Sequence, residues 1–255
     1  NYLMASRLKP NTISTYMRML RSIYNRGVDM HQAPYVHGLF RDVFTGVDTR
    51  QKKAIPIGEL HMLLNKDPQS EKLRRTQAIA NLLFQFCGMP FSDLAHLEKS
   101  NLERGLLKYN RTKTGTPMSI EVLESAQNAI GGLYNKSDAR SSGYPDYLFR
   151  ILSGAYKRNE EGAYREYQSA LRRFNNELKS LSRKLRLHSP VTSYTLRHSW
   201  ATTAKYRGVP IEMISESLGH KSIKTTQIYL KGFELEERTK VNKLNYSYVC
   251  NFKML

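Results

Sequence analysis

The chain has 255 residues, of which 40% are hydrophobic, and its 40 lysines and arginines against 22 aspartates and glutamates give a formal net charge of +18. This length and hydrophobic content are enough to fill the core of a globular protein, and no apolar run approaches the roughly 18 residues that a membrane span needs. Such a charge favours a polyanionic partner, because lysine and arginine release counterions when they neutralise phosphates, so we expect nucleic acid ahead of an acidic membrane surface.

The start of the chain, "NYLMASRLKPNTIS", lacks the apolar core of a secretory signal. The two cysteines, Cys87 and Cys250, have neither metal-ligand spacing nor the pattern of a disulfide framework. We therefore expect a cytoplasmic setting.

The first 51 residues predict one amphipathic helix followed by a loop-rich stretch. A start signal at Pro10 precedes apolar residues at helical spacing, and Gly27 is expected to stop the helix. The charged stretch "DTRQKKAIP" is typical of a connector between domains, so we place a boundary near Gln51. Because about 50 residues rarely build an independent core, we expect residues 1–51 to be part of a larger helical domain.

Residues 52–255 predict a mainly helical domain with a small β-hairpin. A helix with a buried apolar stripe ends at Gly88, and a short helix follows it. The period then changes in "GLLKYNRTKTGTPMSIEV", residues 105–122, which predicts two short strands around a tight turn. A charged helix is expected over residues 160–187; its arginines and lysines either face solvent or contact a DNA backbone.

The last third of the chain contains the densest set of reactive side chains. A capped helix carries Arg197, and Gly219 suits the left-handed residue that ends the next helix. His220 follows at once, and a further helix carries Tyr229. These three side chains can converge on one phosphate, because arginine binds two oxygens at a time and histidine can donate to a third. The tyrosine can then attack it.

These residues resemble the tyrosine recombinases, or phage integrase family. The resemblance rests on "CGMPFSDLAHL", "TKTGTPMSI", "YTLRHSWAT" and "ISESLGHKSIKTTQIYL", which occur in the order of the family. It extends over residues 53–245 and implies a bacterial, DNA-associated protein. The helix "NTISTYMRMLRSIYNRGV" is similar to the back half of the helical core-binding domain of this family. The resemblance implies a recombinase catalytic domain at residues 52–255, preceded by part of a DNA-binding core-binding domain at residues 1–51.

The resemblance also implies DNA strand exchange without metal, ATP or another cofactor. Tyr229 would form a 3′-phosphotyrosyl bond and free a 5′-hydroxyl, and the covalent intermediate would keep the bond energy. Arg197 matches an arginine that clamps the phosphate, and Lys113 matches the lysine that protonates the leaving oxygen. His220 matches a histidine that hydrogen-bonds the phosphate. The ordinary alternative for Tyr229 is a core tyrosine with a satisfied hydroxyl.

Two positions depart from the family pattern. Pro90 stands where the family has an arginine, and Tyr194 stands where it has a histidine. Proline cannot clamp a phosphate, and tyrosine, with a reference pKa of ~10, shuttles protons at neutral pH less well than histidine. Loss of one preorganised donor costs about 3 kcal/mol, so the enzyme is expected to be slow, compensated or inactive.

Arg111 is the candidate for that compensation. Residues two apart in a strand project from the same face, so Arg111 is expected to point the same way as Lys113, toward the place that Pro90 leaves without an arginine. The alternative is an arginine at the strand edge, in solvent or on flanking DNA phosphate.

The sequence therefore supports a site-specific DNA recombinase that acts on a double-stranded DNA site, without a membrane or a small-molecule substrate. It does not distinguish integration, excision and inversion. A catalytically impaired DNA-binding accessory protein with the same fold is the alternative, and the substitution at Pro90 favours it. A general RNA-binding or basic protein would explain the charge but not the order of the motifs.

We expect other roles for the neighbours of Arg197 and for the end of the chain. His198 and Trp200 point away from Arg197 around the helix, so we interpret both as core or supporting residues. The apolar tail, with Tyr246 and Phe252, is expected to need burial. It would dock on a neighbouring subunit in a homotetramer on two DNA duplexes, as the family resemblance implies, or else on its own domain.

Overall fold

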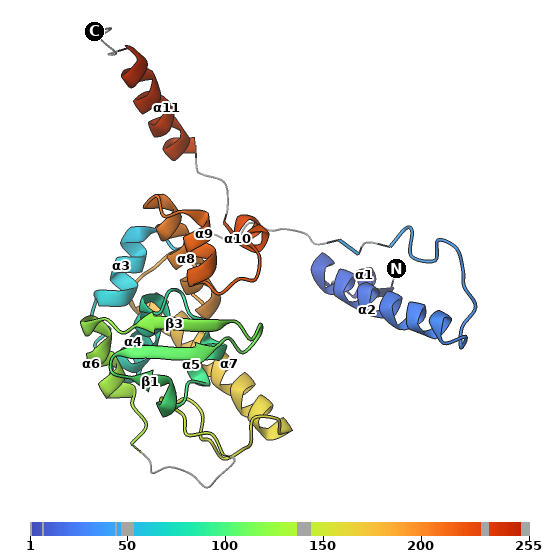
Figure 1. Ribbon diagram of the computed structural model, residues 1–255, viewed down its shortest axis with the longest axis horizontal. Helices are drawn as coiled ribbons and strands as arrows, with labels where there is room; N and C mark the ends of the chain where they lie inside the picture. The colour runs from blue at the N-terminus through green and yellow to red at the C-terminus, as the bar shows by residue number, and fades with distance from the viewer. Residues whose placement is uncertain are drawn as a thin grey trace. The chain divides into compact units, whose positions relative to one another are not determined.

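Helices make up most of the described structure, together with one small antiparallel sheet (Figure 1). The computed structural model describes residues 2–6, 8–43, 45–46, 54–136, 144–230 and 235–250. Contacts divide the chain into two units, residues 1–51 and 52–255. The mainly helical fold class with a small sheet is confirmed. No helix within the described ranges is long and apolar enough to cross a membrane.

The first unit contains the helices α1 (Tyr2–Ala5) and α2 (Pro10–Asp29). Pro10 suits the start of α2, because its missing N–H has no helical partner to lose at that position. The stop predicted at Gly27 is wrong by two residues. Gly27 keeps a helical conformation, and the left-handed residue that follows the helix is His31, with φ of 55°.

The chain that follows α2 folds back against the end of this helix. The hydroxyl of Tyr24 donates to the carbonyl of Pro34 at 2.8 Å. Earlier in the same helix, Met19 and Ile23 remain 58% and 66% exposed. The described part of the first unit therefore leaves much of the apolar face of α2 uncovered.

The elements of the second unit follow in chain order. They are α3 (Ile57–Asn65), α4 (Glu71–Gln85), α5 (Phe91–Ala95), a 3-10 turn (Lys99–Asn101), β1 (Leu102–Glu103), β2 (Leu106–Asn110), β3 (Pro117–Glu121), α6 (Glu124–Leu133), α7 (Glu161–Lys184), α8 (Ser193–Tyr206), α9 (Ile211–Ser217), α10 (Ile223–Tyr229) and α11 (Leu235–Cys250).

The sheet has the order β1-β2-β3, and both pairs are antiparallel. In the pairing of β2 with β3, Leu107 lies opposite Ile120, and both side chains are buried while their strand neighbours are more exposed. This alternation is the pattern of a sheet with one face on the core. The hairpin predicted for residues 105–122 is confirmed. The strand β1 was not predicted, because two residues are too few to show a period.

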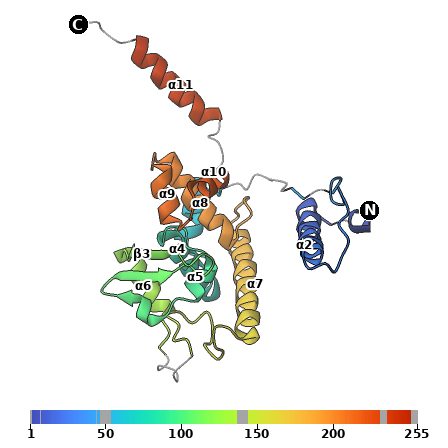
Figure 2. The ribbon, with the colours of Figure 1, turned by 45° about the vertical axis from the view of Figure 1, so that its right-hand side comes forward.

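The helix α4 is central to the second unit, where it packs against α3, α6, α7 and α8. Its Leu82 and Leu83 are fully buried in the main core, as is Leu178 of α7. The exposed face of α7 carries Arg172 and Lys179, which fits either interpretation of that basic helix. Figures 1 and 2 show α8, α9 and α10 gathered at one end of the unit.

A second, smaller apolar cluster holds that end together. It consists of Ala201, Ile214, Leu218 and Leu230, which come from α8, α9 and the residues after α9 and α10. Leu218 is fully buried, and burying one leucine side chain contributes about 2 kcal/mol. The cluster fixes the main chain around Leu218 and His220, where the candidate site lies.

Candidate active site

Arg197 is held by the main chain of two loops. Thr192 and Thr195 start α8 with a reciprocal capping box, in which each threonine side chain accepts from the main-chain N–H of the other. Arg197, 6% exposed, donates to the carbonyl of Gly88 at 2.9 Å and to that of Leu218 at 2.6 Å. The guanidinium is therefore fixed between the loop after α4 and the loop after α9.

Arg111 reaches the same carbonyl from the hairpin. Its Nε donates to a carboxylate oxygen of Asp93 at 3.0 Å, and its Nη1 donates to the carbonyl of Leu218 at 2.5 Å. The side chains of Arg111 and Asp93 are 8% and 0% exposed. Arg111 and Arg197 therefore meet at one main-chain oxygen, with the Asp93 carboxylate beside Arg111.

The prediction that Arg111 and Lys113 share a strand face is wrong. The strand β2 ends at Asn110, and the N–H of Gly115 donates to the carbonyl of Arg111 at 2.8 Å to close the turn. Arg111 is buried and Lys113 is exposed. The alternative of a solvent-exposed strand-edge arginine fails for the same reason.

Because Gly219 has no side chain, the side chain of Arg111 has room to reach the site. Its φ of +64° confirms the predicted left-handed conformation. A Cβ at this position would lie 2.5 Å from Cδ of Arg111 and 2.7 Å from Sδ of Met118, closer than side-chain atoms pack. Gly88, with φ of +65°, likewise allows a close approach: a Cβ built on Gly88 would lie only 3.2 Å from Cα of Arg197.

His220 lies beside Arg197, directly after Gly219. Its Nε2 is 3.2 Å from Nη2 of Arg197, and its Nδ1 is 2.8 Å from the hydroxyl oxygen of Thr226. Burial, together with the nearby positive charges of Arg197, Arg111 and Lys113, lowers the pKa of His220 to about 4. His220 is therefore neutral at neutral pH.

Tyr229 is the last residue of α10, and its side chain lies outside the described residues. The main chain around it is described: the N–H of Leu230 donates to the carbonyl of Thr226 at 2.8 Å, and both of these residues are buried. The structure therefore fixes the helix that carries Tyr229 and leaves the role of its hydroxyl a prediction. In the C-terminal tail, Phe252 also lies outside the described residues.

Pro90 and Tyr194, the two departures from the family pattern, lie at the edge of the group formed by Arg197, Arg111 and His220. Pro90 is the N-cap residue directly before α5, and its carbonyl accepts from the N–H of Asp93 at 3.0 Å. It thus helps to place the carboxylate that binds Arg111, although it offers no donor itself. Tyr194 lies in the first turn of α8 and is 43% exposed. Near them, His198 is buried and Trp200 packs on the smaller apolar cluster, as expected of core residues.

The model of the phage integrase family matches residues 57–235. The chain belongs to the phage integrase family. It is 30% identical over 190 residues to tyrosine recombinase XerD of Halalkalibacterium halodurans, an alignment that covers 71% of this chain and 57% of that protein. It is 28% identical over 204 residues to a probable integrase/recombinase protein of Methanocaldococcus jannaschii, covering 77% of this chain and 58% of that protein. The chain thus spans somewhat over half the length of these relatives.

Among solved structures, the chain resembles the Tn1549 transposon integrase in complex with circular intermediate DNA. The TM-score is 0.61 at 15% identity, over 94% of this chain and 81% of that one. At this identity the likeness shows the fold. The predicted resemblance to the phage integrase family is confirmed by the family match.

Two groups of the candidate site were not predicted from the sequence. Asp93 is buried and lies inside the motif "CGMPFSDLAHL", where the sequence shows an acidic residue close to several apolar ones. Leu218 acts through its main-chain oxygen, so its side chain carries no signal at all. Among the described residues, no three His, Cys, Asp or Glu side chains gather where they could hold a metal ion.

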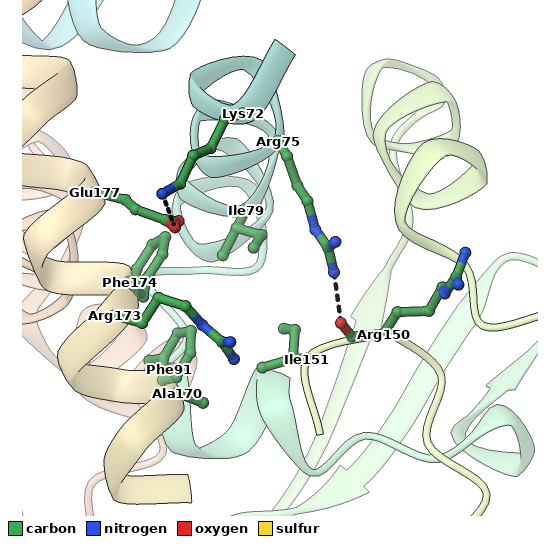
Figure 3. A pocket seen from close by; sticks show the side chains of 10 residues that line it. All are labelled: Lys72, Arg75, Ile79, Phe91, Arg150, Ile151, Ala170, Arg173, Phe174 and Glu177. Atoms are coloured by element: carbon green, nitrogen blue, oxygen red, sulfur yellow. Dashed lines mark hydrogen bonds and ion pairs between the residues drawn. The ribbon is translucent and has the colours of Figure 1, made fainter. Parts of the chain in front are cut away.

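A separate pocket of about 360 Å³ lies between α4 and α7 (Figure 3). Lys72 forms an ion pair with Glu177 there at 3.4 Å, and Arg75 donates to the carbonyl of Arg150. It shares no residue with the group around Leu218, and its lining contains no histidine, tyrosine, serine or cysteine that could act as a nucleophile or base. Its lining residues are Lys72, Arg75, Ile79, Phe91, Arg150, Ile151, Ala170, Arg173, Phe174 and Glu177.

Proposed function

We propose that this chain is a site-specific DNA recombinase, which breaks and rejoins DNA through a 3′-phosphotyrosyl intermediate on Tyr229. The observation that carries the proposal is the meeting of Arg111 and Arg197 at the carbonyl of Leu218. Two buried cations that share one neutral oxygen favour an anion in front of them, and a DNA phosphate has the charge and the oxygens to accept from both.

In the proposed cleavage step, the hydroxyl of Tyr229 gives its proton to water while its oxygen bonds to phosphorus, and the bond from phosphorus to the 5′-oxygen breaks. Lys113 gives a proton to that leaving oxygen. Arg111 and Arg197 bind the non-bridging oxygens, where negative charge develops. Rejoining is the same step in reverse with the partner strand, and the bond energy stays in the phosphotyrosine, so the reaction needs neither nucleotide nor metal.

Arg111 supplies the phosphate-binding arginine that the family has at the position of Pro90. It lies within reach of the same carbonyl as Arg197, and its positive charge acts on His220. Each donor to the developing charge is expected to contribute roughly 10² in rate, so a second guanidinium restores most of what Pro90 removes. Tyr194 supplies a neutral hydroxyl at the rim, where it would at most donate one hydrogen bond.

The proposed partner is a double-stranded DNA recombination site, bound by a homotetramer on two duplexes. The net charge of +18 and the solved DNA complex of a similar integrase support the DNA partner. The exposed Leu244 and Tyr246 on α11, at 69% and 73%, support docking of the tail on a neighbouring subunit.

A catalytically impaired accessory protein is the second candidate, and Pro90 is the observation that favours it. The two candidates differ in whether the chain forms a covalent bond with DNA. A duplex of its own site, nicked so that religation fails, is incubated with the chain, and the products are separated on a denaturing gel. The recombinase predicts an adduct with the parent and none with Tyr229→Phe, while Tyr246→Phe still forms it.

Two other outcomes would change the role of Tyr229 or of the whole chain. An adduct that persists in Tyr229→Phe contradicts the assignment of the nucleophile. A parent chain that binds the site and forms no adduct is the accessory protein.

A further inference from the structure

The pocket between α4 and α7 combines an apolar floor with a positively charged rim (Figure 3). The rings of Phe91 and Phe174 stack in the floor, with their centroids 4.7 Å apart. Its volume of about 360 Å³ lies at the small end of the range of ligand pockets, so it suits a short stretch of peptide. The floor consists of the buried or half-buried side chains of Ile79, Phe91, Ile151, Ala170 and Phe174.

The rim carries more positive charge than its one carboxylate offsets. Glu177 already has two partners, because it forms an ion pair with Lys72 at 3.4 Å and accepts from the buried hydroxyl of Thr76 at 2.9 Å. Arg75 donates to a neutral main-chain carbonyl at 2.5 Å. Within the described part of the chain, neither Arg75 nor Arg173 has a carboxylate at ion-pair distance. The rim therefore offers two guanidiniums to a ligand that brings negative charge.

The two guanidiniums come from opposite walls of the pocket. Figure 3 shows the side chain of Arg173 reaching from α7 toward Ile151, and that of Arg75 reaching from α4 toward the carbonyl of Arg150. The side chain of Arg150 itself points outward. Since Arg75 is held by a hydrogen bond before any ligand arrives, it has less conformational freedom to lose on binding.

The pocket opens on the other side of α7 from the first turn of α8. The side-chain oxygen of Asn175 accepts from the N–H of Ser193 at 2.9 Å, and Ser193 begins the helix that carries Arg197. Arg173 and Asn175 are two residues apart, so they point about 200° apart around α7. A phosphate bound at Arg197 therefore leaves the pocket open.

The floor distinguishes between kinds of anion. A DNA backbone would bring phosphates to the rim but no apolar group to the floor, which would stay in contact with water. An acidic peptide brings both groups, because its carboxylates bind guanidiniums through paired hydrogen bonds and an apolar side chain between them is buried on the floor. Arginines around an apolar pocket are also typical of the energetically dominant part of protein–protein interfaces.

We propose that this pocket is a docking site for an acidic segment of a partner protein, with an apolar side chain on the floor and carboxylates on Arg75 and Arg173. The site uses none of the residues around Leu218, so it can exist whether or not the chain recombines DNA. Its floor includes Phe91, two residues before Asp93 on α5, so a bound partner would contact the helix that holds the Asp93 carboxylate.

The chemistry of the ligand is tested by isothermal titration calorimetry on the full chain. The probe is a capped peptide with leucine at its centre and two glutamates on each side, and one peptide is expected to bind per chain. Serine at the centre is expected to weaken binding about tenfold or more, because the floor loses its apolar partner. Absence of binding by the leucine peptide, or equal affinity for the two peptides, overturns the proposal.

The place of binding is tested with matched variants. Arg173→Ala is expected to weaken binding of the leucine peptide by roughly threefold to tenfold. Arg172→Ala removes an exposed arginine from the next position of α7, outside the pocket lining, and is expected to leave binding unchanged. Equal weakening in these two variants would show attraction to the net charge alone and would overturn the proposal.

A variant of the floor complements those of the rim. Ile151→Ala shortens a half-buried side chain and is expected to weaken the leucine peptide while leaving the serine peptide unchanged. Urea unfolding of each variant measures whether its stability matches that of the parent. A stable Ile151→Ala protein that binds the leucine peptide as tightly as the parent does would contradict the seat of the apolar side chain on this floor.

Two further measurements address other occupants. A chain saturated with duplex DNA is expected to bind the leucine peptide within a few-fold of the free chain. Loss of peptide binding, with DNA binding weakened more by Arg173→Ala than by Arg172→Ala, would assign the pocket to the DNA surface. Sedimentation of the parent and of Arg173→Ala is expected to be the same. A fall in self-association in Arg173→Ala would assign the pocket to a second copy of this chain, and either assignment overturns the proposal.

Discussion

Arg111 and Arg197 donate to the same oxygen, the carbonyl of Leu218, at 2.5 and 2.6 Å. Two guanidiniums at one oxygen repel each other, and burial limits the screening of that repulsion by water. Asp93 offsets the charge of Arg111 through an ion pair of 3.0 Å. The arrangement keeps two cations aimed at one point, where the proposed reaction places a phosphate.

Replacement of Arg111 tests whether it serves the reaction. Arg111→Ala is expected to slow single-turnover cleavage by roughly 10² or more at saturating protein, because a donor to the developing charge is lost. Lys108→Ala removes an exposed cation from the same hairpin and is expected to change binding and its salt slope by about one unit at most. A rate for Arg111→Ala within a few-fold of the parent rules out compensation for Pro90.

Urea unfolding can measure how much the ion pair between Asp93 and Arg111 contributes to the free energy of unfolding. Asp93→Ala leaves a buried arginine without its carboxylate and is expected to lower the free energy of unfolding by about 3–5 kcal/mol. Glu161→Ala breaks a pair with Arg165 whose side chains are 75% and 76% exposed. Its loss is expected to stay below about 1 kcal/mol. Equal losses in the two variants would show that the buried pair does not hold Arg111.

Gly219 and Gly208 form a matched pair of glycines. Both have positive φ, +64° and +77°, so alanine at either position is expected to cost about 1–2 kcal/mol of stability. Only the Cβ at Gly219 would meet Arg111, at 2.5 Å, while a Cβ at Gly208 meets nothing within 4 Å. Gly219→Ala is therefore expected to lose cleavage as Arg111→Ala does, and Gly208→Ala to keep it. Cleavage unchanged in both variants would contradict the need for this close approach.

The sequence predicts what depends on local pattern. The apolar period predicts α2, the change of period predicts the hairpin of β2 and β3, and Gly219 is expected in the left-handed conformation that it adopts. The stop of α2 at Gly27 is misplaced, because a glycine can continue a helix when the chain beyond it still finds partners.

The geometry of the candidate site depends on contacts that no local pattern carries. Arg111 is buried because Gly219, 108 residues away, leaves room for it and offers a carbonyl. Strand alternation pointed to Arg111 for a reason that the structure contradicts, since the strand ends one residue earlier. The oxygen of Leu218 belongs to the main chain, and the partner of His220, Thr226, is one of two adjacent threonines that the sequence does not distinguish.

The tail offers a test of assembly. Removal of the residues after Lys243 deletes the exposed Leu244 and Tyr246 and is expected to weaken cooperative assembly on two DNA duplexes, because those apolar side chains would lose their burial on a neighbour. Gel-shift titration with one and two sites measures this cooperativity. Unchanged cooperativity, with a stable truncated chain, would assign the tail to its own domain.

The most direct test of the recombinase assignment is to identify the residue that bonds to DNA. The adduct trapped on the nicked duplex is digested with protease and nuclease, and mass spectrometry locates the residual nucleotide on the peptides. We predict the nucleotide on the peptide that contains Tyr229, attached through its phenolic oxygen. A nucleotide on any of the 16 tyrosines other than Tyr229 would contradict the assignment of the nucleophile, and no adduct from a chain that binds its site would contradict the recombinase assignment.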